Sequence, residues 1–303
     1  MRINGNVVMA VGSGIASLLI AFSEVAAAAP GLEGLTLQIT STQDAIYPME
    51  PVCLTITLGN ESQQPVLAHD MIEPNTGYVS FYVAGEDGRF HLHESGNSPV
   101  VSGDANMREL PPGYKRSVRT HLWHGTTANS PFRSLFPAPG QYVLKAKFAS
   151  IDGGSKIESN IVKVRVVEPE ARDEEAWRYL KNHELENHYT LLGSTDDPKK
   201  IGKIEDFMER FPDSRYAVYG HYSLGLAYYV TKHLDRAGVS LEKAAGRQDF
   251  CLRDEVLYSL VRICIRKGEV GKARQYLRDL EEAYPNSAMT GSAGHDIEKA
   301  TRP

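Results

Sequence analysis

The sequence predicts two domains: an antiparallel β-sandwich followed by a domain of antiparallel helical repeats. Three observations lead to this prediction. The chain has 303 residues, enough for about two domains. Apolar and polar residues alternate from about 32 to 168, whereas apolar residues after 172 recur at helical spacing. The stretch around Pro212 is repeated around Pro285, 73 residues later, which indicates an internal helical repeat.

The composition excludes several classes of protein. Hydrophobic residues make up 42% and charged residues 23% of the chain, values typical of globular proteins. The net charge is −5, whereas a protein that binds nucleic acid through phosphate attraction usually has a basic surface. We therefore expect a folded protein without a nucleic-acid partner.

The N-terminus predicts export. Residues 3–23 contain no charged side chain, and Ala26–Ala29 supplies the small residues that signal peptidase requires. We expect residues 1–28 to be a cleaved signal peptide, which would leave a periplasmic or secreted protein without a membrane span. A retained membrane anchor and a cytoplasmic protein are the alternatives.

The β-sandwich is expected over residues 32–168. Turn-forming glycines, prolines and asparagines separate short alternating runs, as in antiparallel sheets. The expected strands cover residues 35–40, 52–58, 78–83, 89–93, 115–123, 141–148 and 160–167.

Two phrases in this half resemble bacterial immunoglobulin-like domains. Pro139-Gly140-Gln141-Tyr142 resembles the entry to a late strand, where a tyrosine hydroxyl ties the corner to upstream backbone. Residues 159–166 resemble the last strand of such domains. The resemblance implies an immunoglobulin-like sandwich, a fold that carries many different functions.

The helical domain is expected over residues 172–288, followed by a polar, flexible tail at 289–303. Asp196-Asp197-Pro198 is a helix-start signal with proline in the first turn. The expected helices cover residues 172–192, 199–211, 214–231, 234–245, 252–267 and 270–284.

The repeat resembles the tetratricopeptide repeat family. Leu224-Gly225-Leu226-Ala227-Tyr228 matches the first helix of the repeat, and Ala237, Leu241 and Ala244 match the second. Small residues at Gly225, Ala237 and Ala273 would let helices approach closely. The resemblance is greatest to repeats of bacterial envelope proteins that serve the Tol–Pal system and outer-membrane assembly. It implies stacked helix pairs with a concave surface for peptides.

One stripe of side chains is the candidate binding site. Tyrosine and arginine dominate binding hot spots, so the stripe could form a groove for a peptide or a partner helix. Alternatively the stripe is core, covered by the helix expected at 172–192. Its members are Tyr219, Tyr222, Leu226, Tyr229, Tyr258 and Arg262.

The cysteines and histidines predict no metal site. Cys251 and Cys264 would lie roughly 20 Å apart along one helix, beyond disulfide reach, and Cys53 lies in an expected strand of the other domain. We therefore expect three buried thiols. The histidine pairs 91/93 and 121/124 occur without CxxC, HExxH or a carboxylate cluster.

The sequence shows no catalytic motif and no cofactor-binding motif. We therefore expect an exported, non-enzymatic binding or assembly protein of the cell envelope, whose partner is another envelope protein or a peptide. One alternative is an inhibitor or ligand-binding sandwich, with residues 93–110 as the presented loop. A second alternative is an unrecognised hydrolase or metalloenzyme.

Overall fold

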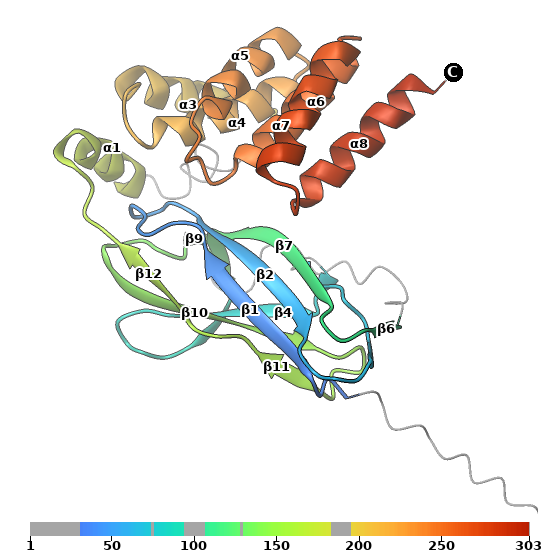
Figure 1. The fold of residues 1–303 in the computed structure, drawn as a ribbon. Coiled ribbons are helices and arrows are strands. Elements are labelled where there is room, and N and C mark those ends of the chain that lie inside the picture. The colour runs from blue at the N-terminus through green and yellow to red at the C-terminus, as the bar shows by residue number, and fades with distance from the viewer. Residues whose placement is uncertain (1–30, 74–75, 94–106, 128–129, 183–194, 303) are drawn as a thin grey trace, which may run out of the picture.

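The chain folds into β-sheets followed by helices (Figure 1). The computed structural model describes residues 31–73, 76–93, 107–127, 130–182 and 195–302. The expected order of a β half and a helical half is confirmed. The expected signal peptide at 1–28 and the end of the expected helix at 172–192 lie outside the described residues.

The described residues of the β half form two larger antiparallel sheets and two small ones. The first larger sheet has the order β1 (Leu35–Ser41), β2 (Val52–Asn60), β7 (Lys115–Leu122). The second has the order β11 (Lys156–Glu158), β10 (Gly140–Ala149), β4 (Val79–Ala84), β5 (His91–His93), with β12 (Val162–Val166) also paired to β10. The small sheets pair β3 (Val66–Ala68) with β6 (Arg108–Leu110), and β8 (His124–Thr127) with β9 (Ser130–Ser134).

One hydrophobic core joins the two larger sheets. Leu54 and Ile56 occupy every second position on β2 and are fully buried, as are Leu144 and Phe148 on β10. Side chains of one strand face two sides in turn, so the residues between them point away from this core. The expected tyrosine corner is also present, because the Tyr142 hydroxyl donates to the Ala138 carbonyl at 3.0 Å.

The helical half contains seven described helices. They are α1 (Ala171–Asn182), α3 (Pro198–Arg210), α4 (Ala217–Val230), α5 (Leu234–Ala245), α6 (Arg253–Arg266), α7 (Val270–Ala283) and α8 (Ala288–Thr301). Asp197 begins α3 as expected: its carboxylate accepts from the Lys199 amide at 2.9 Å, and Pro198 follows in the first turn.

The flexible tail expected at 289–303 is wrong, since α8 occupies most of it. Ser287 caps α8 by accepting from the Met289 amide, and its hydroxyl donates to Asp254 at 2.7 Å. Ala293 and Ile297, one turn apart, are buried with residues of α6 and α7. A serine cap and a narrow apolar stripe are therefore enough to fix this polar segment.

Gly225 allows α4 and α5 to approach closely. A Cβ atom at this position would collide with Cγ of Leu241, a fully buried side chain on α5. Ala237 and Ala273, the other two expected small contacts, are also fully buried. The expectation that small residues bring the helices together is confirmed at Gly225 by this geometry.

Gly225→Ala should lower the free energy of unfolding by about 1–3 kcal/mol, because the added methyl group would have to displace the fully buried Leu241 side chain. The matched control is Gly238→Ala on α5, where a Cβ meets nothing within 4 Å. There the better helix propensity of alanine should raise stability by up to about 1 kcal/mol. Urea unfolding of both variants measures the difference; equal stabilisation by both would contradict this account of α4–α5 packing.

Candidate functional site

The helical half rests against the outer face of the sheet β1-β2-β7. Arg119 and His121 on β7 and Trp123 directly after it occupy alternate positions, so their side chains lie on the same face of the sheet. Cys53 on β2 is paired directly with His121 and shares that face. Each of these side chains contacts the helical half, so this face of the sheet forms the interface between the halves.

A disulfide joins the two halves at this face. Cys53 and Cys251 are bonded, with their Cα atoms 5.7 Å apart. Cys264 is a buried free thiol. The expectation of three buried thiols is therefore wrong for two of them. Sequence spacing excluded a bond between Cys251 and Cys264 but could not show that Cys53 faces the helical half.

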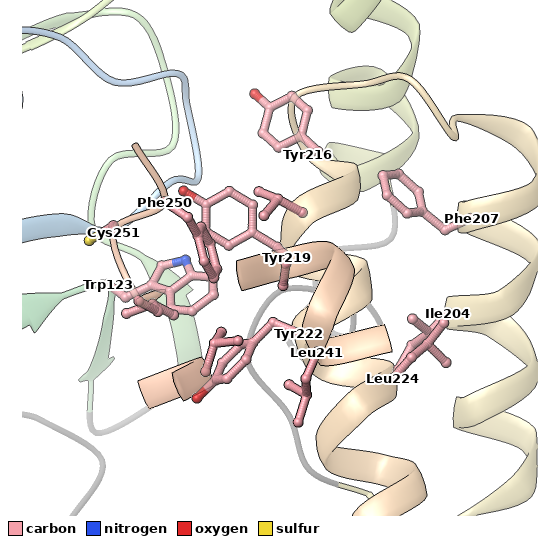
Figure 2. Close-up of a cluster of buried hydrophobic side chains, with 14 of the residues drawn as sticks. Trp123, Ile204, Phe207, Tyr216, Tyr219, Tyr222, Leu224, Leu241, Phe250 and Cys251 are labelled. Carbon is pink, nitrogen blue, oxygen red and sulfur yellow. The ribbon is translucent and has the colours of Figure 1, made fainter. Parts of the chain in front are cut away.

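Aromatic side chains fill the space beside the disulfide (Figure 2). The rings of Trp123 and Tyr219 have centroids 5.4 Å apart, and Tyr219 lies edge-on to Phe250 at 5.1 Å. The Trp123 indole donates to the Met49 carbonyl at 2.8 Å, so its polar atom is also satisfied. These rings belong to one hydrophobic cluster that includes residues of both halves.

The loop before β2 contributes a buried ion pair to the interface. Glu50 is 2% exposed and accepts two hydrogen bonds from the Arg215 guanidinium, at 2.8 and 2.7 Å. Burial raises the pKa of Glu50, although the charge of Arg215 opposes the shift. The Tyr216 hydroxyl donates to the Pro48 carbonyl at 2.9 Å nearby. Loss of Arg215 would therefore leave the buried Glu50 carboxylate uncompensated.

His121 and Glu255 form a second ion pair across the interface. Their closest atoms are 3.2 Å apart, and the Tyr222 hydroxyl donates to the same carboxylate at 2.6 Å. Burial alone would lower the pKa of His121, but the charge and hydrogen bond of Glu255 outweigh it and raise the pKa. Burial likewise opposes ionisation of Glu255, yet His121 and Tyr222 hold the pKa of that carboxyl below its usual value.

Two residues of the candidate stripe are buried in this interface. Tyr219 and Tyr222 on α4 are 3% and 5% exposed. Trp123 and Phe250 contact Tyr219, and Phe250 also contacts Tyr222. The sequence left open whether these tyrosines form a groove or a core. In this structure they are core, and Trp123 of the β half contributes to their cover.

The rest of the stripe lies outside the interface. Leu226, Tyr229 and Tyr258 are partly buried, and Arg262 is exposed. The Arg262 guanidinium lies over the Tyr229 ring at 5.0 Å and over the Tyr258 ring at 5.7 Å. Arg266, which sequence reasoning missed, lies over Tyr229 at 4.0 Å. We call these five side chains the Tyr–Arg patch.

The histidines that the structure describes do not gather into a site. The His69 ring lies between Tyr78 and Phe148, and His91 pairs with Asp87 at 3.2 Å. Within the described ranges, no group of three or more His, Cys, Asp or Glu side chains is placed to hold a metal ion. Most of the loop considered for inhibition, residues 94–106, lies outside those ranges.

No helix in the described part of the chain is both long and apolar enough to cross a bilayer.

Comparison with known proteins gives no family. No family model matches the chain, and no curated protein matches it. Similar solved structures include the alkylpurine DNA glycosylase AlkC of Pseudomonas fluorescens, which is 12% identical over 44% of this chain and 31% of that chain, with a TM-score of 0.25. The chain thus spans about a third of the glycosylase.

Two further structures are similarly remote. The CARDB domain of the PF1109 protein from Pyrococcus furiosus is 12% identical over 44% of this chain and 87% of that chain, with a TM-score of 0.23. The sporulation control protein Spo0M of Bacillus subtilis is 11% identical over 49% of this chain and 55% of that chain, with a TM-score of 0.24. TM-scores this low do not establish a shared fold.

The His121–Glu255 pair should make stability depend on pH. A raised histidine pKa adds stability that is complete below about 6.5 and lost as pH rises through the folded-state value. A lowered carboxyl pKa adds stability above about 4.5 that is lost as pH falls through its folded-state value. Both contributions are therefore present between about pH 4.5 and 6.5.

His121→Gln should accordingly cost more stability at pH 5.5 than at pH 8.5, by on the order of 1 kcal/mol. Urea unfolding at the two pH values measures this difference. His295→Gln, at an exposed position on α8, is the control and should change stability equally little at both. An identical cost of His121→Gln at both pH values would show that the ion pair does not stabilise the interface.

Proposed function

We propose that this protein is an exported, non-enzymatic binding protein of the cell envelope that recognises another protein or a peptide through the Tyr–Arg patch. In this proposal the β half is an immunoglobulin-like sandwich that supports the helical half. The helical half is a short tetratricopeptide-like stack that carries the binding surface.

Local geometry supports both fold assignments. The Tyr142–Ala138 hydrogen bond is the corner expected of an immunoglobulin-like domain, and residue Ile46 forms a parallel bridge with Val166 of β12. In the helical half, Gly225 packs against Leu241 at the place where the repeat pattern requires a small residue. These features favour the two resemblances over an unrelated β-plus-α arrangement.

The disulfide supports export. Disulfides form and persist in oxidising compartments such as the periplasm, and they are rare in the cytosol. The Cys53–Cys251 bond closes a chain separation of 198 residues and sits in the interface itself. A bond in this position fits a protein that works where thiols oxidise, in agreement with the signal-like N-terminus.

One observation carries the binding proposal: Tyr229 remains partly exposed on the helical surface with two arginines stacked on it. Interfaces draw most of their binding energy from a few tyrosine, tryptophan and arginine side chains. Neighbouring tyrosines of the same stripe are already used by the interface between the halves. The Tyr–Arg patch contains the remaining stripe residues together with Arg266, and we propose that it binds the partner.

Tyr229→Ala should reduce capture of a partner by about fivefold or more, because truncation of an interface residue that contributes to binding costs more than about 1 kcal/mol. The full oxidised chain serves as bait in an envelope extract of the source organism, and quantitative mass spectrometry measures the captured proteins. The matched control is Tyr276→Ala, a partly buried tyrosine on α7 outside the Tyr–Arg patch. Equal capture by wild type and Tyr229→Ala, or equal loss in both variants, would contradict the proposed site.

Tyr222→Ala, included in the same experiment, tests whether the buried part of the stripe serves folding rather than binding. Its side chain is buried, so the substitution should cost about 3 kcal/mol of stability. Thermal unfolding of the variants before capture distinguishes this loss of folding from a loss of binding.

A further inference from the structure

Arg262 and Arg266 are placed as a pair. They lie one turn apart on α6, both side chains are exposed, and both guanidinium groups lie over the ring of Tyr229, at 5.0 and 4.0 Å. Groups four residues apart on a helix are about 6 Å from each other. The tyrosine ring therefore holds two positive charges at a fixed spacing.

Neither guanidinium forms a hydrogen bond or ion pair with any described residue. Three other arginines of this half are engaged: Arg215 with Glu50, Arg236 with Glu205, and Arg253 with the Ala245 carbonyl. The nearby carboxylate of Asp296 accepts a hydrogen bond from the Tyr258 hydroxyl at 3.0 Å. The donors of Arg262 and Arg266 are thus available to a ligand.

The chemistry of two free guanidinium groups favours carboxylates. Arginine binds carboxylates in a planar, two-pronged geometry that lysine cannot reproduce. In an extended peptide, side chains two residues apart lie on one side and are about 7 Å apart. This spacing is close to that of the two arginines.

We propose that Arg262 and Arg266 bind an extended acidic peptide segment in which two carboxylates stand two residues apart. The proposal rests on the proposed function and specifies the class of partner. Nucleic acid is a poorer fit, because the chain has a net charge of −5 and the Tyr–Arg patch contains only two cations.

Fluorescence anisotropy with labelled probe peptides tests this proposal on the full oxidised chain. The first probe has the sequence Gly-Ser-Glu-Phe-Glu-Ser-Gly, and the second replaces both glutamates by glutamine. The acidic probe should bind at least tenfold more tightly. Arg262→Gln combined with Arg266→Gln should remove this preference, whereas the double change to lysine should retain only part of it.

Arg274→Gln and a single-stranded DNA probe complete the experiment. Arg274 is exposed on α7 and forms no hydrogen bond or ion pair with any described residue, so its substitution changes the charge without changing the Tyr–Arg patch and should preserve the preference. Circular dichroism checks that each variant is folded. Absence of binding, equal binding of both peptides, binding unaffected by the double glutamine variant, or DNA binding as tight as the acidic probe would each overturn the proposal.

Equal binding of both peptides that still depends on Tyr229 would overturn only the acidic preference and would leave the proposed binding function standing. A failure of Tyr229→Ala to reduce capture would instead refute the binding function itself.

Discussion

The attachment of the helical half to one face of a single sheet is the constraint on which the rest of the structure depends. Strand alternation puts Leu54 and Ile56 into the core and leaves Cys53 on the opposite face of the sheet, beside His121. The disulfide to Cys251 and the Trp123–Tyr219 contact then fix the helices on that face. The same few residues therefore stabilise the interface and determine which surface of the helical half stays exposed to solvent.

This attachment divides one stripe into two chemically different parts. Near the sheet, Tyr219 and Tyr222 are buried. Tyr219 packs against Phe250, and the Tyr222 hydroxyl donates a hydrogen bond to Glu255. Further along α4, Tyr229 lies beyond the β half and remains partly exposed. A binding function could therefore use only the part of the stripe around Tyr229, where Arg262 and Arg266 rather than residues of the sheet contact the tyrosine ring.

Local sequence signals predicted most of the longer elements but neither the short strands β3, β6, β8, β9 and β11 nor the assembly of the two halves. The bounds of α5, Leu234–Ala245, and the cap of α3 at Asp197 follow from helical spacing and short-range chemistry. The disulfide joins positions 198 residues apart, and no local pattern encodes such a contact. The one available signal was Cys53 itself, an apolar side chain on the otherwise polar side of its strand. Helix α8 was missed because its apolar stripe is only two side chains wide.

Peptide mass spectrometry without reductant, on protein isolated from its native compartment, tests the central claim most directly. The account predicts that the peptides containing Cys53 and Cys251 are covalently joined, that Cys264 is modified by a thiol reagent only after unfolding, and that the chain begins near Ala29. Three free thiols in the isolated protein, or a bond that involves Cys264, would contradict the arrangement of the two halves described above.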